Sequence, residues 1–166
     1  MGDLVTHLCT ALLPAAFLPR SRYTVVVALG TVLPDLGSRV IPIGLDLLFG
    51  SLLPDEVWYP FGVLHDPAAL VLTCGLVALV FVEEQRRAVF GALLIGCALH
   101  LGLDLLQDHH GQGYFLLFPA STARFELGWI GSEDTVYAAA PLAALTSVVW
   151  AIRLWAVEGG RSEGTP

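Results

Sequence analysis

A histidine and an aspartate stand four residues apart in an apolar stretch of the chain, at His100 and Asp104. In an α-helix this spacing places both side chains on one face, so both can reach the same point. Imidazole nitrogen and carboxylate oxygen together, without thiolates, suit zinc or a similar divalent ion. The pair therefore predicts part of a metal-binding or catalytic site.

Other ionisable side chains occupy apolar segments in the same way. His7 opens the first such segment, Asp35 lies in the second, and His65 with Asp66 begins the third. If these segments cross a membrane, an isolated charge deep in one of them costs roughly 2.5–3.5 kcal/mol. We therefore expect these groups to pair with one another or with a cation.

The composition indicates that the elements holding these residues are membrane helices. Hydrophobic residues make up 55% of the 166 positions, charged residues make up 14%, and the mean hydropathy is +0.72. A soluble domain normally carries about 25% charged residues, because it covers its surface with them. The net charge is −7 and the chain has no lysine, which argues against nucleic acid as a partner. The fold class predicted is all-α, a polytopic membrane bundle in the lipid bilayer.

Five apolar stretches can each be interpreted as a span, since a crossing needs about 20 residues. They run over residues 4–18, 24–41, 61–82, 88–106 and 135–157. The first is short and contains Pro14, so the prediction is four to five transmembrane helices. Together they form a single domain, 1–157, followed by a disordered tail, 158–166. The connection 42–60 is apolar, and its Trp58 and Tyr59 suit the headgroup level.

The arginines predict how the bundle is oriented. Cytoplasmic loops carry an excess of basic residues, and six of the eight arginines follow or end the first, third and fifth stretches: Arg20, Arg22, Arg86, Arg87, Arg153 and Arg161. With these inside, the N-terminus and the loop 108–134 lie outside. His7, Asp35, His65 and the His100–Asp104 pair then all lie toward the outward ends of their helices. Since the arginines alone set the orientation, this coincidence favours one shared site.

Each of these residues also has a purely structural interpretation. A histidine in a membrane span is commonly a hydrogen-bonded core residue. Asp35 after Pro34 can cap half a helix, and Asp66 before Pro67 can begin one. The meeting of four segments at one membrane face shifts the balance toward a metal or catalytic site. His110, with the histidine before it, is expected to be solvated in a loop.

Four motifs follow one another along most of the chain. They are THL with His7, LGTVLPDLGSR with Asp35, LHDPAAL with His65, and ALHLGLDLLQDHHGQGYFLLFP with His100 and Asp104. In order and spacing they resemble the predicted membrane-bound metal-dependent hydrolases, the family that includes LexA-regulated inner-membrane proteins of bacteria. The likeness continues through STARFELGWIGSEDT. Two positions differ. Gly37 replaces a second acid, and the central motif, which in the family usually reads His-Arg-Gly-x-Thr-His with two histidines, here has only His65 followed by Asp66.

The resemblance implies a membrane-embedded hydrolase that uses one or two zinc ions, in the bacterial or archaeal cytoplasmic (inner) membrane. The implied metal ligands are His7, Asp35, His65, His100 and Asp104. Asp66 would be the general base or an extra ligand. A site at headgroup depth on the extracytoplasmic side suits an ester or phosphoester, carried by a lipid or lipid-linked substrate.

A non-catalytic subunit of a larger membrane complex would show much the same pattern. Its His/Asp pairs would then be interhelical hydrogen bonds retained from a degenerate hydrolase-like site. Alternatively, a histidine would bind a pigment or haem, for which His100, flanked by Gly96 and Gly102, is the candidate. The metal content of the purified protein distinguishes the two hypotheses.

Overall fold

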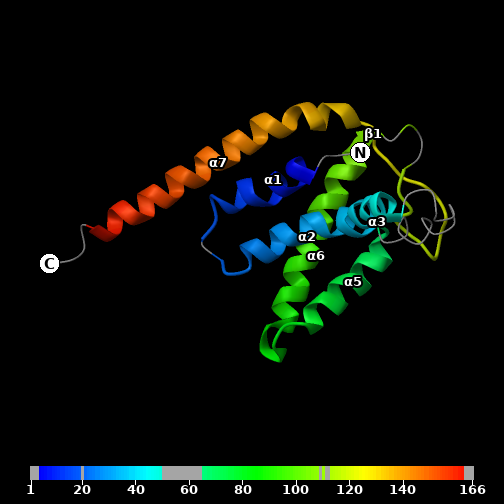
Figure 1. The fold of residues 1–166 in the computed structure, drawn as a ribbon, viewed down its shortest axis with the longest axis horizontal. Helices are drawn as coiled ribbons and strands as arrows, with labels where there is room; N and C mark the ends of the chain where they lie inside the picture. The colour runs from blue at the N-terminus through cyan, green and yellow to red at the C-terminus, as the bar shows by residue number, and fades with distance from the viewer. Residues whose placement is uncertain (1–3, 20, 50–64, 109, 111–112, 163–166) are drawn as a thin grey trace.

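The computed structural model describes residues 4–19, 21–49, 65–108, 110 and 113–162. Most of these residues are helical, which confirms the all-α class (Figure 1). The helices are α1 Leu4–Ala15, α2 Thr24–Asp35, the π-helix η1 Leu36–Val40, α3 Ile41–Phe49, α5 Pro67–Leu79, α6 Glu83–Leu106 and α7 Ser132–Ser162. Two short strands, β1 Gln107–Asp108 and β2 Ile130–Gly131, pair in parallel.

Five apolar helical segments correspond to the five expected stretches. Among the described residues, three are long and apolar enough to cross a membrane, namely Thr24–Phe49, Glu83–Leu106 and Glu133–Val157. Two are shorter, α1 and α5. The segments together make the expected membrane bundle of helices.

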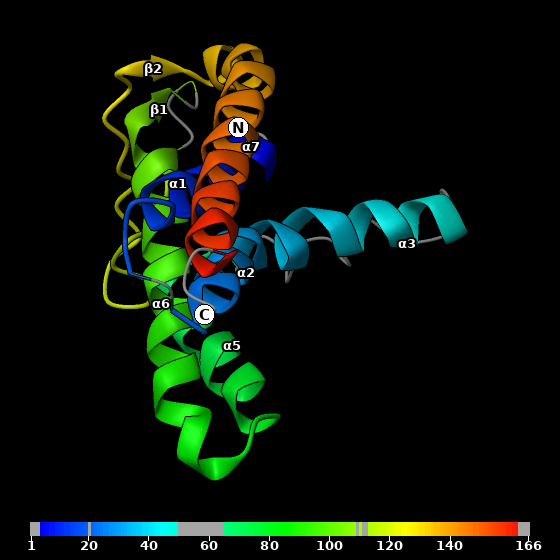
Figure 2. The ribbon, with the colours of Figure 1, turned by 90° about the vertical axis from the view of Figure 1, so that its left-hand side faces the viewer.

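The boundaries of several helices differ from those predicted. The second segment continues through η1 and α3 to Phe49, beyond the predicted end at Ile41, and Pro42 lies within it. Figure 2 shows α3 projecting away from the other helices. Trp58 and Tyr59 lie outside the described residues. The predicted tail, 158–166, begins inside α7, which runs to Ser162.

Helices α2 and α6 cross at two glycines. A Cβ on Gly96 would overlap the backbone of Val27 and of Gly30, and a Cβ on Gly30 would overlap the carbonyl of Leu93. Small residues at such a crossing let two membrane helices approach closely. About one turn beyond the crossing, α2 carries Asp35 and α6 carries His100, so this contact brings two of the predicted site residues together.

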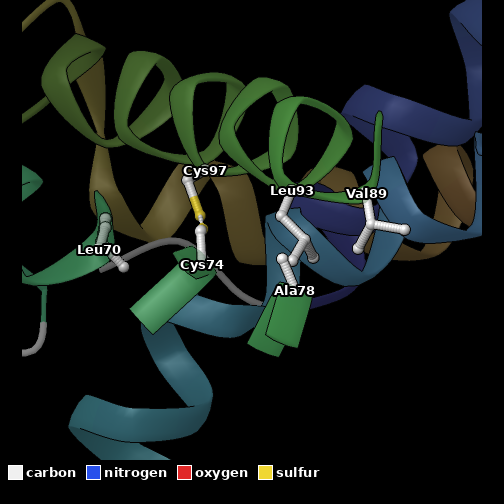
Figure 3. Close-up of a cluster of buried hydrophobic side chains, with 6 residues drawn as sticks. All are labelled: Leu70, Cys74, Ala78, Val89, Leu93 and Cys97. Atoms are coloured by element: carbon white, nitrogen blue, oxygen red, sulfur yellow. Dashed lines mark hydrogen bonds between the residues drawn. The ribbon is translucent and has the colours of Figure 1, made fainter. Parts of the chain in front are cut away.

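A cluster of buried apolar side chains joins α5 to α6 (Figure 3). It consists of Leu70, Cys74 and Ala78 from α5, with Val89, Leu93 and Cys97 from α6. The thiol of Cys97 also donates a hydrogen bond to the carbonyl of Gly30, at 3.4 Å. That carbonyl lies four residues before Pro34, which has no N–H to offer it. Cys97 thus satisfies a backbone group that the proline in α2 leaves free.

Helix α1 lies beside α7, and the two run in the same direction (Figure 1). Thr6 donates to the carbonyl of Thr135 at 3.0 Å, and the indole of Trp150 donates to the carbonyl of Leu12 at 2.9 Å. The non-helical segment between α6 and α7 covers the end of α6. Its N–H groups at Leu127 and Trp129 bond the last carbonyls of α6, which a helix cannot satisfy itself.

Candidate metal centre

Imidazole and carboxylate groups from three helices and from the turn before α5 meet at one buried place. The five residues named from the sequence are all there: His7 on α1, Asp35 on α2, His65 before α5, and His100 and Asp104 on α6. His7 and His100 are fully buried, and His65, the most exposed of the five, is 6% exposed. Potential ligand atoms form two sets, and within each set the atoms lie within 4.8 Å of one another. One set is His7, His100 and Asp104, and the other is Asp35, His65 and His100.

The carboxylate of Asp104 lies at the centre of the cluster. The Nε2 atoms of His7 and His100 are each 3.2 Å from one of its oxygens, and the Nε2 of His65 is 2.8 Å from Oδ2. Only the His65 contact has hydrogen-bond geometry; the Nε2 atoms of His7 and His100 have no hydrogen-bond partner among the described residues. Atoms that approach one another without donor–acceptor alignment are expected around a shared ion.

Hydrogen bonds on the far sides of two rings determine their tautomers. His100 Nδ1 lies 2.7 Å from the carbonyl oxygen of Thr31, which only accepts, so Nδ1 carries the hydrogen. The hydroxyl of Ser38 donates its one hydrogen to the carbonyl of Pro34 at 2.8 Å. Its oxygen also lies 3.4 Å from His65 Nδ1, so it accepts the hydrogen of that nitrogen. Neutral rings held this way present the lone pair of Nε2 to the cluster, as a metal ligand must.

These ring nitrogens and the carboxylate could hold a metal ion between them, or the rings could carry the protons themselves. The rings of His7 and His100 are stacked, with centroids 3.8 Å apart and planes at 19°. Two protonated imidazoles at this distance would repel each other in a buried place. The stacking favours neutral rings.

The π-helix explains how Ser38 and Asp35 come to this place. Pro34 interrupts the α-helical bonding, and the wider turn that follows starts directly after Asp35 and contains Ser38. Single π-turns inside longer helices are frequent at functional sites. The backbone irregularity thus positions both a predicted ligand and the residue that orients His65.

Tyr114 belongs to the site and was not found from the sequence. Its hydroxyl donates to Asp104 Oδ2 at 2.9 Å, and its ring stacks on His65 with centroids 5.0 Å apart. The backbone of Tyr114 exchanges two 3.0 Å hydrogen bonds with Phe125. Gly113 permits this pairing, because a Cβ there would lie 2.7 Å from the carbonyl oxygen of Phe125. The only signal in the sequence was the Gly-Tyr pair inside the fourth motif.

Asp66, the predicted general base, is buried and follows His65, but its carboxylate belongs to neither set of ligand atoms. His110 is solvated as expected, with its side chain 88% exposed. Glu83 begins α6, so it lies roughly 30 Å along the helix from Asp104.

A family model described as YdjM inner membrane protein matches residues 2–161, nearly the whole chain. No curated protein and no solved structure matches the chain. The family match and the apolar helices together confirm an integral protein of the inner membrane. The family description mentions neither a hydrolytic activity nor regulation by LexA.

Proposed function

The chain belongs to the YdjM inner membrane protein family, and we propose that it is a membrane-embedded, metal-dependent hydrolase. One observation carries the proposal: three histidine Nε2 atoms lie 2.8–3.2 Å from a single buried carboxylate, that of Asp104. Among the described residues, no arginine forms an ion pair with that carboxylate. A divalent ion would compensate the negative charge of the Asp104 carboxylate and would let the stacked rings of His7 and His100 stay neutral.

Zinc is the ion that this donor set suits best, since imidazole and carboxylate are its usual ligands where thiolates are absent. His7, His100 and Asp104 would hold one ion, and Asp35 with His65 would complete its coordination or hold a second ion that shares His100. When bound, such an ion polarises an ester or phosphoester and lowers the pKa of a water molecule.

The protein's own groups would orient the ligands and move the proton. Thr31 and Ser38 hold the rings of His100 and His65 in the tautomers that bind metal. Tyr114 holds Asp104 through its hydroxyl. Asp66 is our candidate for the group that accepts a proton from the attacking water, since it is a buried carboxylate directly after the ligand His65.

The proposed class of substrate follows from the depth of the His/Asp cluster in the membrane. The cluster is near the end of α6 that is remote from Arg86 and Arg87. With these arginines on the cytoplasmic side, the cluster lies at the level of the outer headgroups. An ester or phosphoester of a lipid or lipid-linked molecule is the substrate that reaches this level.

The rival function is that of a non-catalytic subunit in a larger membrane complex. In that function Asp104 would accept hydrogen bonds from Tyr114 and from His65, whose hydrogen would then lie on Nε2, and such bonds can by themselves hold helices together. In that case the cluster would stay intact without a metal.

The zinc content of the purified protein tests the proposal. We expect one or two zinc ions per chain, measured by elemental analysis after dialysis, and a loss of most of this zinc in Asp104→Asn. Glu84→Gln, at the exposed opposite end of α6, should keep it. Hydrolysis of a fluorogenic ester or phosphodiester lipid should depend on the zinc and stop with a chelator. A folded protein that binds no zinc would overturn the metal centre and favour the subunit.

A further inference from the structure

A second feature lies far from the metal centre, where residues of α1, of α2 and the turn before it, and of α7 line an open cavity of about 600 Å³. Its apolar wall includes Leu12, Val25, Trp150 and Leu154, and two arginines, Arg22 and Arg153, also line it. Along α7, Arg153 is roughly 27 Å from Thr135, which contacts Thr6 next to the metal centre. The cavity is therefore separate from the proposed hydrolase site.

The two arginines bring positive charge that none of the described carboxylates neutralises. Within the described part of the chain, neither Arg22 nor Arg153 forms an ion pair. Arg153 donates to the carbonyls of Ala15 and Leu18, and its guanidinium lies 5.2 Å from the centre of the Trp150 ring. These neutral partners satisfy some of its five N–H groups but leave its charge uncompensated.

We propose that this cavity binds an anionic phospholipid, with an acyl chain along the apolar wall and the phosphate against Arg22 and Arg153. The volume lies within the usual range for ligand sites, about 300–1,000 Å³. Anionic lipids of the cytoplasmic leaflet are attracted to arginines at the membrane surface. Trp150 suits the boundary between tail and headgroup, since its indole is apolar with one polar edge. The charge of the arginines selects the lipid class, and the apolar wall selects a lipid over a free phosphate ion.

Quenching of Trp150 by brominated lipids tests this site in the full chain. Replacing Trp58, Trp129 and Trp155 with phenylalanine leaves Trp150 as the sole indole. The protein is placed in phosphatidylcholine vesicles that contain an equal mole fraction of dibrominated phosphatidylglycerol or dibrominated phosphatidylcholine. We expect the anionic lipid to quench Trp150 more strongly, because each arginine should enrich it about fivefold.

Substitutions then locate the charge that causes the preference. Arg22→Gln should reduce the preference for the anionic lipid about fivefold, and Arg153→Gln should do the same. Arg153 also bonds the end of α1, so Arg22→Gln, at an exposed side chain, is the variant that separates binding from folding. Arg86→Gln is the matched control, since Arg86 bonds the carbonyl of Phe81 away from the cavity.

Any of three results would overturn the proposal. One is equal quenching by the two brominated lipids. The second is a preference for the anionic lipid that Arg22→Gln leaves intact. The third is a preference that Arg86→Gln lowers as much as Arg22→Gln does. In both of these cases the preference would arise from the general surface charge. Zinc content is measured in the same samples, so that a loss of the metal centre is recognised separately.

Discussion

His100 donates the hydrogen on Nδ1 to the backbone carbonyl of Thr31, across a distance of 2.7 Å. The bond joins α6 to α2, and it leaves the other ring nitrogen, Nε2, 3.2 Å from the carboxylate of Asp104. The packing of two helices thereby decides which nitrogen of His100 is available to a metal ion. Stability of the helix crossing and metal affinity should therefore depend on each other.

The glycine crossing of α2 and α6 provides the first test of this link. In Gly96→Ala the new Cβ would overlap the backbone of Gly30, so we expect a loss of about 1–3 kcal/mol of stability. Zinc content should fall together with it. Gly91→Ala is the control on the same helix, because a Cβ there meets nothing within 4 Å, and it should keep both properties. Equal thermal stability of the two variants would contradict the close crossing.

His100 and Asp104 should act as one unit if they share an ion. We expect His100→Ala and Asp104→Ala each to remove most of the bound zinc, and the double variant to add little further loss. His110→Ala serves as the control, since that side chain is exposed to solvent. Additive losses of stability with unchanged zinc would instead indicate a hydrogen-bonded core without a metal.

Tyr114→Phe separates the hydroxyl of Tyr114 from its ring. The variant keeps the ring that stacks on His65 and loses the hydrogen bond to Asp104. We expect zinc affinity to fall about 10- to 100-fold, as for other groups that orient metal ligands. Competition with a fluorescent zinc chelator measures this change. Tyr137→Phe, at an exposed position on α7, should leave the affinity unchanged; an unchanged affinity in Tyr114→Phe as well would remove Tyr114 from the site.

The proposed orientation predicts which loops a membrane-impermeant maleimide can reach. A cysteine placed at Thr122, in the exposed segment between α6 and α7, should be labelled from outside intact cells. A cysteine placed at Glu84, next to Arg86, should be labelled only after the cells are opened. The native cysteines Cys9, Cys74 and Cys97 are buried and give a low background. The reverse pattern would place the metal centre on the cytoplasmic side.

The sequence alone determined the fold class and the set of predicted ligands. Apolar stretches near the length of a bilayer crossing leave helices as the available structure, because each helix satisfies its own backbone hydrogen bonds. The four-residue spacing of His100 and Asp104 places them on one face through local geometry. Histidines and aspartates inside apolar stretches need partners, and this need identified five residues that the structure brings together.

Only the tertiary structure decided how these residues are used. The tautomer of His100 depends on the carbonyl of Thr31, which lies 69 positions away in the sequence. Tyr114 reaches Asp104 through a non-helical segment, and such a segment has no periodicity from which its course can be predicted. The lipid cavity depends on Arg153 meeting the end of α1. Local spacing follows from the geometry of one helix, whereas contacts between distant segments follow from how helices cross and where loops return.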